Sequence, residues 1–319
     1  MKIVKKEEDG GIIKFNAICE DSAVYTQFGK GGEQSDQTQT FGALSTTKTY
    51  FIDMPIVQAS DNNAGFYIGA GRQSKDMKWP GSALYSSIDQ NGSYNNIESF
   101  YNDTSAGSTL SVLGNFNDGN IIDYINTVDV MLINGELESV SEEKFLSGFN
   151  TCIIGNEYIN FKNATLLPNG AYRLSTLLRG RWNTEDQINT HNQGDRFILM
   201  NTSGIKRIPT DPSILNQLRF YKNPTFGKTL NETAVNTFRN TGKGLQCYPV
   251  DDFQANRNNV GDLSISWKSR VRGNGLLMNN QDIYDPDGDV YEIDIYNSAN
   301  TNIIRTININ NAKSYIVPS

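Results

Sequence analysis

Short runs in which apolar and polar residues alternate recur along most of this 319-residue chain. Alternation with a period of two is typical of a strand that buries one face. Clear examples are residues 11–19, 49–54, 65–70, 82–88, 128–133, 262–267, 291–296 and 303–309. Asn134-Gly135 tolerates positive φ at both residues and predicts a hairpin turn with a return strand over 136–140. The pattern predicts an all-β chain built from several sandwich-like or barrel-like modules, with few short helices.

The composition agrees with this fold class. Charged residues make up 20% of the chain, and Gly alone occurs 28 times. The chain is poor in the residues that helices prefer and rich in residues typical of strands and turns. Residues 141–149 predict a short helix, because Ser141 can cap it and two acids follow in the first turn. Residues 231–239 fit a helix or a strand.

Two segments that contain proline divide the pattern into modules. Residues 206–215 carry two prolines and are typical of a segment that crosses between modules, and residues 248–257, which contain Pro249, form a second candidate boundary. We expect a β domain over 1–205, with 1–45 as a candidate separate arm, and a connecting β segment over 206–250. Residues 251–319 resemble a fibronectin type III domain, because Trp267 lies in an early alternating strand. We expect this last domain to be incomplete.

The charge and the cysteines exclude several classes of protein. The net charge of −7 argues against nucleic acid as the main partner, since phosphate binding needs clustered Lys and Arg. No run approaches the length of a membrane span, and no apolar region follows the basic N-terminus as in a secretory signal. Cys19, Cys152 and Cys247 are far apart, so we expect free, buried thiols.

Candidate catalytic and metal sites are few. His191 is the single histidine, and a Ser-His-Asp triad must use it, yet its Asn-rich and Gly-rich surroundings indicate a turn. Asp285, Asp287 and Asp289 form a weak calcium candidate that a turn explains equally well. No pattern brings two carboxylates together for glycan hydrolysis, which stays an unfavoured alternative. We predict no catalytic residue and no cofactor.

The most informative run is 177–182, where Arg179 and Arg181 flank Gly180. Guanidinium groups beside a backbone bend can hold the carbonyls or carboxylates of neighbouring strands. The run predicts an internal clamp or a contact with a neighbouring subunit. The candidate structural and interface residues are Arg179, Arg181, Trp182, His191, Trp267, Arg270 and Arg272.

The same run carries a resemblance. Leu177-Leu-Arg-Gly-Arg-Trp-Asn-Thr-Glu185, followed by His191 and Gly194-Asp-Arg-Phe197, resembles the "LLRGRxGTE…H…GExF" signature of tail hub proteins. It is found in the C-terminal region of the megatron-like hubs of gene transfer agents and related phages. Further similar segments follow the family's order at 79–87, 132–139, 148–157 and 261–272, so about residues 50–310 are covered. The family's upstream hub segment and hydrolase-like barrel have no counterpart here, nor does 1–45 match.

The resemblance implies a structural component of a tail tip or baseplate hub, located in the virion and extracellular once the particle is released. It implies a homotrimer that contacts other tail-tip or tail-tube proteins, and it offers no established catalytic residue to transfer. A receptor-binding or carbohydrate-binding module is the alternative, with a host glycan or outer-membrane protein as partner. That alternative predicts an exposed aromatic cluster drawn from Tyr85, Tyr94, Phe100 and Tyr101.

Overall fold

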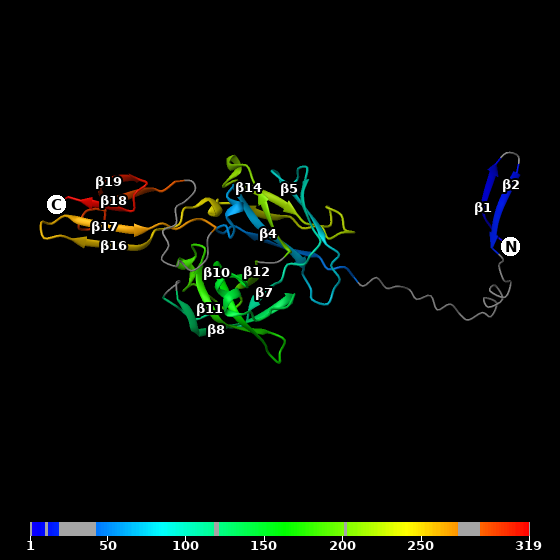
Figure 1. Cartoon of the computed structure of the whole chain (residues 1–319), viewed down its shortest axis with the longest axis horizontal. Helices are drawn as coiled ribbons and strands as arrows, with labels where there is room; N and C mark the ends of the chain where they lie inside the picture. Colours follow the sequence, from blue (N-terminus) through cyan, green and yellow to red (C-terminus); the bar gives the residue numbers. More distant parts are fainter. Residues whose placement is uncertain are drawn as a thin grey trace. The chain divides into compact units, whose positions relative to one another are not determined.

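The computed structural model describes residues 2–9, 12–18, 43–117, 121–200, 203–273 and 288–318. The chain divides into two compact units, Met1–Gly42 and Ala43–Ser319. The first contains an antiparallel hairpin of β1 (Lys2–Asp9) and β2 (Ile12–Ile18) (Figure 1). The second contains the remaining strands in three parts, and almost all of its regular structure is β. The predicted all-β class is therefore confirmed.

The first part of the larger unit is a closed barrel with the strand order β10-β11-β8-β7-β12-β9. Its strands are β7 (Ala106–Thr109), β8 (Ile122–Asn134), β9 (Thr151–Ile154), β10 (Glu157–Leu166), β11 (Tyr172–Arg181) and β12 (Arg196–Leu199). Alternation places Val128, Val130 and Leu132 of β8 in the barrel core. The predicted helix is present as α2 (Glu142–Leu146), where Ser141 accepts a hydrogen bond from the Lys144 N–H.

The return strand predicted after Asn134-Gly135 is wrong. Gly135 has a φ of 89°, as expected of the turn, but residues 135–140 form no strand. They run irregularly beside β10, where the Val140 N–H bonds the Lys162 carbonyl and Ser139 accepts from the Ala164 N–H. A local turn signal cannot show that β7 and β11, rather than the segment after the turn, pair with the two edges of β8.

The second part consists of two sheets with a shared core. One has the order β13-β4-β3, and the other has the order β15-β14-β5-β6. Their strands are β3 (Thr47–Ile52), β4 (Gly65–Arg72), β5 (Ser82–Ser87), β6 (Asn95–Phe100), β13 (Ile205–Pro209), β14 (Leu218–Lys222) and β15 (Asn236–Arg239). Short 3-10 turns occur at Ala59–Asp61, Glu185–Gln187, Pro212–Ile214 and Lys243–Leu245. Phe66, Leu84, Phe100 and Tyr221 lie in the core between the sheets.

These pairings change the interpretation of 206–250. β13 pairs with β4, and β14 pairs with β5, so this segment completes sheets that residues 43–100 begin. It is not a connection between modules. Pro209 misled the sequence interpretation because proline is tolerated at the end of an edge strand, where β13 lies. Residues 231–239, left open between helix and strand, contain β15.

The third part is a small sandwich of two sheets. One has the order β16-β17-β20, from β16 (Asp251–Arg257), β17 (Leu263–Lys268) and β20 (Ser314–Val317). The other is the hairpin of β18 (Val290–Tyr296) and β19 (Ile303–Asn310). Trp267 faces inward, and its ring centre lies 5.1 Å from that of Tyr291 across the two sheets.

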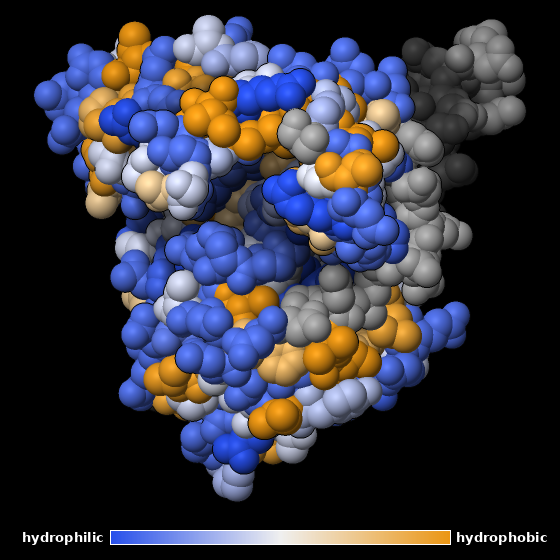
Figure 2. Space-filling view, turned by 90° about the vertical axis from the view of Figure 1, so that its left-hand side faces the viewer, coloured by the Kyte–Doolittle hydropathy of each residue, from blue (hydrophilic) through white to orange (hydrophobic). Residues whose placement is uncertain are grey.

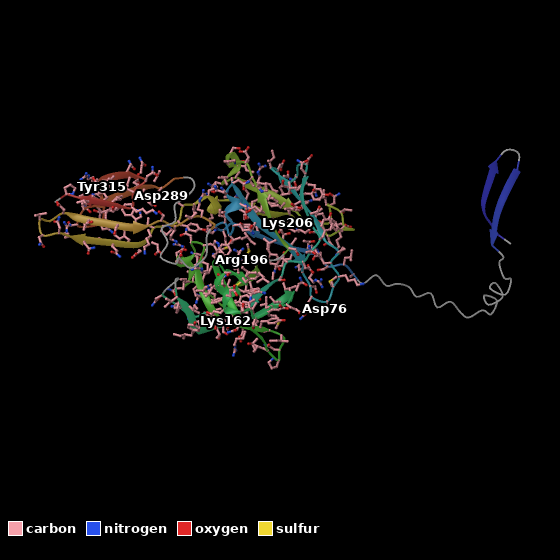
Figure 3. The ribbon with its side chains drawn as sticks, in the orientation of Figure 1. Asp76, Lys162, Arg196, Lys206, Asp289 and Tyr315 are labelled. Atoms are coloured by element: carbon pink, nitrogen blue, oxygen red, sulfur yellow. The ribbon has the colours of Figure 1, made fainter. Side chains whose placement is uncertain are left out.

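A shared apolar cluster joins the barrel to the two sheets. It combines Ile52 and Tyr67 from the sheets with Ile153, Tyr158 and Ile198 from the barrel. Arg196 of β12 lies at this joint (Figure 3), where Nε donates to the Gly155 carbonyl at 2.8 Å and Nη1 donates to the Phe51 carbonyl at 3.1 Å. Burial lowers the pKa of Arg196 from its usual value. The joint thus fixes the barrel against the sheets.

The surface seen in Figure 2 is mostly hydrophilic, with small groups of hydrophobic residues between the polar ones. Within the described ranges, no helix combines the length and the apolar character needed to cross a membrane.

Candidate functional site

The candidate site surrounds Arg179, whose side chain is fully buried near the end of β11. Gly180 next to it has a φ of 58°, a conformation that favours glycine. A Cβ at Gly180 would lie 2.8 Å from the Glu185 Cα, so a larger residue does not fit. The pairing of β11 with both neighbouring strands is also irregular. Its register with β8 shifts after Ser175, and its register with β10 shifts after Tyr158 of β10. Such irregularities change the direction of side chains, and this part of β11 turns Arg179 inward.

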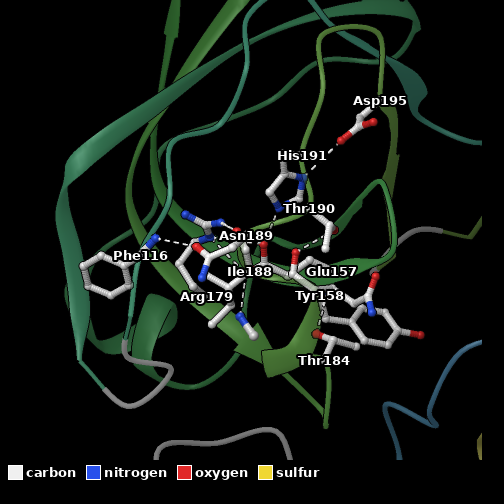
Figure 4. Close-up of polar contacts among 12 residues, drawn as sticks. Phe116, Glu157, Tyr158, Arg179, Thr184, Ile188, Asn189, Thr190, His191 and Asp195 are labelled. Carbon is white, nitrogen blue, oxygen red and sulfur yellow. Dashed lines mark hydrogen bonds and ion pairs between the residues drawn. The ribbon is translucent and has the colours of Figure 1, made fainter.

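The guanidinium of Arg179 has an acceptor for each of its five N–H groups. Figure 4 shows Arg179 beside Glu157 and Ile188, which supply part of this set. Nε and Nη2 donate to the Glu157 carboxylate at 2.9 and 3.0 Å. Nη1 donates to the Gly114 carbonyl at 3.1 Å and to Asp123 Oδ2 at 3.3 Å. Nη2 also donates to the Ile188 carbonyl at 2.7 Å. A bidentate pair of this kind is a strong form of hydrogen bonding.

His191 extends the network on the other side of Glu157. Its Nε2 lies 2.5 Å from Glu157 Oε2, and its Nδ1 lies 3.1 Å from Asp195 Oδ2. An imidazolium can donate to both carboxylates, whereas a neutral ring can donate to one. Glu157 Oε1 also accepts the Gly180 N–H at 2.5 Å. We call the set Asp123, Glu157, Arg179, His191 and Asp195 the Arg179 network.

The Arg179 network is built to hold strands together. Asp123 lies on β8, Glu157 on β10 and Arg179 on β11, while His191 and Asp195 precede β12. The side chains of Glu157 and Asp123 have no exposed surface. Both carboxylates contact the Arg179 guanidinium. Removing one member of a buried ion pair costs about 3–5 kcal/mol, because the other charge stays buried.

The other predicted residues lie apart from the Arg179 network. Trp182 belongs to the cluster at the joint and packs edge-on against Tyr158, with ring centres 5.5 Å apart. Arg181 is buried nearby, and burial lowers its pKa to about 10. Trp267 lies in the core of the sandwich. The run 177–182 therefore contributes side chains to two parts of the molecule, the barrel interior and the joint.

Arg270 and Arg272 lie where the sandwich meets the rest of the unit. Arg270 Nη2 donates to Glu185 Oε1 at 2.5 Å, and its guanidinium lies 5.3 Å from the Tyr248 ring centre. Burial raises the pKa of Tyr248 to about 12, against the opposing charges of Arg270 and Arg272. Arg270 thus makes a contact within the chain, and its assignment to a contact between subunits stays a prediction.

The calcium candidate falls partly outside the described residues, because Asp285 and Asp287 lie there. Asp289 is buried and accepts a hydrogen bond from Ser269 Oγ at 3.1 Å. In the part of the chain that the structure describes, no three His, Cys, Asp or Glu side chains are placed to hold a metal ion.

The aromatic cluster predicted for ligand binding is not assembled. Phe100 is 1% exposed and belongs to the core, whereas Tyr101 is 72% exposed. Tyr94 precedes β6 and Tyr101 follows it, so these two residues lie at opposite ends of that strand. Tyr85 is half-buried on β5. This distribution removes the observation that favoured an aromatic binding groove.

Sequence reasoning did not identify the acidic members of the Arg179 network. An arginine inside an apolar run requires a carboxylate partner if it is buried, and the run Leu177-Leu-Arg179 carries that signal. The partners Glu157 and Asp123 are 22 and 56 residues away along the chain. Only the barrel topology brings them to Arg179.

The barrel coincides with the part of the chain that matches a known family. Residues 104–198 match a family model described as Rcc01698-like, C-terminal. The match begins just before β7 and ends within β12. It therefore spans the barrel strands and every member of the Arg179 network.

Comparisons with whole proteins add less information about this chain than the family match does. No curated protein matches the chain. One similar solved structure is that of the chicken CNTN1 FN1-FN3 domains, with 7% identity over 86% of this chain and 88% of that chain, at a TM-score of 0.16. The strands of the structure itself establish the all-β class.

Proposed function

We propose that this chain is a structural component of the tail tip or baseplate hub of a phage or phage-derived particle. The observation that carries the proposal is the Arg179 network, a completely bonded buried charge cluster inside a closed barrel. Such a cluster fixes the geometry of the strands that carry it, and its two fully buried acids, Glu157 and Asp123, both bond Arg179. The ordered resemblance of the sequence to tail hub proteins supplies the type of assembly.

In this proposal the protein acts as a homotrimer and contacts neighbouring tail-tip or tail-tube proteins. A rigid block suits this role, because a subunit that transmits load must keep its shape. The mostly hydrophilic surface seen in Figure 2 agrees with subunit contacts that are polar and remain hydrated. The protein belongs to the virion, and the released particle carries it outside the cell.

Two measurements test the proposal. Native mass spectrometry of the purified chain should give the mass of three copies, and antibody-gold labelling of purified particles should mark one end of the tail. A monomeric chain that is absent from purified particles would contradict the proposal. The variant Arg173→Met, altered at the barrel surface, should assemble normally, whereas Arg179→Met should be lost from the particles.

A further inference from the structure

A polar cleft of about 450 Å³ opens beside β3, in the part of the molecule formed by the two sheets. It is lined by residues 46–49 and by the segment 223–236, which joins β14 to β15, together with Gln73. Its volume lies within the range of about 300–1,000 Å³ that is usual for small-molecule sites. It is separate from the barrel and from the Arg179 network.

Most of the residues that line this cleft carry a hydroxyl or amide side chain. Five threonines line it, together with two asparagines, one glutamine, two lysines and one glutamate. The carboxylate of Glu232 is held by Thr229, whose N–H donates at 2.9 Å, and Lys228 lies close enough to lower its pKa further. The opposite charges of Lys228 and Glu232 offset each other, and the remaining lining offers mainly neutral hydrogen-bonding groups.

Two of the threonines form a pre-organised wall. Thr225 Oγ1 donates to the Ser45 carbonyl at 2.9 Å, so the neighbouring Thr47 hydroxyl donates to Thr225 Oγ1 at 2.8 Å. Thr47 Oγ1 in turn accepts the Trp79 indole N–H at 2.9 Å. Both hydroxyl hydrogens are therefore committed, and the wall keeps a fixed donor and acceptor pattern.

Asn223 supplies a second observation that points to a ligand. Asn223 is among the residues that line the cleft although it is only 2% exposed, and its Nδ2 donates to Thr49 Oγ1 at 3.0 Å. Its buried Oδ1 has no hydrogen-bond partner. Buried polar atoms are normally bonded, so an exception calls for an explanation. If the amide is reversed, Nδ2 takes the place of Oδ1, and a ligand hydroxyl can pair with either atom.

We propose that this cleft binds a neutral saccharide unit, with the Asn223 amide bonding one of its hydroxyl groups. A sugar ring presents several hydroxyls, which can donate to acceptor oxygens of the threonine wall and accept from the amide and lysine N–H groups of the lining. The site gives the chain a means of contacting a glycan, which goes beyond a structural role. The inference does not depend on the tail-tip proposal, because the cleft can be tested on the purified chain alone.

The test is a titration of the full chain with maltose. Binding is monitored by the NMR chemical shifts of the asparagine side-chain amides and of the backbone amides of residues 46–49. Wild type should show saturable shifts confined to the cleft. Asn223→Ala should weaken binding about tenfold, the effect of losing one hydrogen bond to a buried group. Asn236→Ala, at an exposed position that lines the cleft, should weaken maltose binding less. Because Asn236 is exposed, this variant should fold as wild type does. Asn308→Ala, at an exposed position on β19, is the matched control and should bind as wild type does.

Sodium sulfate serves as a second probe. If sulfate shifts the cleft resonances and maltose does not, the cleft is an anion site and the proposal is wrong. Absence of maltose-dependent shifts, or equal shifts in wild type and in both cleft variants, would also overturn it. The oligomer mass and particle labelling described above are independent readouts, so failure here is distinguishable from failure of the tail-tip proposal.

Discussion

The barrel and the C-terminal sandwich are both made of short antiparallel strands, yet they bury their interiors to different degrees. Among the described residues, the barrel cluster contains 13 buried and 2 partly buried residues, whereas the sandwich cluster contains 3 buried and 6 partly buried residues. Ile265 of β17 is buried, but Ala255, directly opposite it on β16, is exposed. The β18–β19 hairpin therefore covers β17 and leaves β16 uncovered.

This difference explains how the barrel can bury a cluster of several charges, whereas among the described residues of the sandwich the buried charged side chain is that of Asp289. A closed barrel has no edge strands, so water is excluded on all sides and a buried guanidinium must be bonded completely. The Arg179 network meets that requirement. The sandwich relies on apolar contacts around Trp267 that remain partly open to water, and its stabilisation per residue is smaller.

The largest expected effect separates two arginines of the same strand. Arg179→Met should lower the free energy of unfolding by about 3–5 kcal/mol, because Glu157 and Asp123 stay buried without their counter-charge. Arg173→Met is the matched control, since Arg173 also lies on β11 and pairs with an aspartate of β8, Asp129, but at the surface. It should change stability little. Urea unfolding measures both, and equal effects would contradict the role given to burial.

A smaller effect should distinguish the two apolar cores. Leu174→Ala in the barrel should cost about 2–5 kcal/mol, since its side chain is fully buried. Ile293→Ala in the sandwich should cost roughly 1 kcal/mol, because its side chain is only partly buried and loses less apolar contact. Thermal unfolding followed by near-ultraviolet circular dichroism gives both values. A larger loss at Ile293 would show that the sandwich is better covered than the exposure of β16 indicates.

Local elements of the barrel were predictable, but neither its closure nor its buried network was. The alternation in 128–132 and the capping residue Ser141 are local signals, and both predicted the elements that form. The pairing of β13 with β4 and of Glu157 with Arg179 depends on contacts distant in sequence, which no local pattern contains. Cys247 was expected to be buried but is exposed, and Cys152 is buried as expected. Cys19 lies outside the described residues.

The two described cysteines provide a chemical test of the same contrast. Burial raises the pKa of the Cys152 thiol well above its usual value, and the charge of Glu157 raises it further. Because the thiolate is the reactive form, iodoacetamide at pH 8 should leave Cys152 unmodified in the folded protein. Cys247 is exposed and should be alkylated. Peptide mass mapping measures both, and rapid labelling of Cys152 without denaturant would show that the barrel opens readily.

The smallest expected effect is a pH dependence at the barrel surface. The hydrogen bonds from Arg173 lower the pKa of Asp129 below its usual value. Its contribution to stability is therefore present above the unfolded-state pKa and is lost as the pH falls through the folded-state pKa. The Tm difference between wild type and Asp129→Asn should be slight at pH 7 and should vanish in stronger acid. A difference that grows on acidification would reverse the sign argued here.

A double-mutant cycle on Glu157→Gln and Arg179→Met tests most directly whether the Arg179 network is a structural clamp. Each single variant should be strongly destabilised, and the double variant should lose less than the sum of the two, with a coupling of about 0.5–3 kcal/mol in urea unfolding. Additive losses, or a gain in stability from Glu157→Gln of the kind found when a strained catalytic residue is replaced, would contradict the clamp.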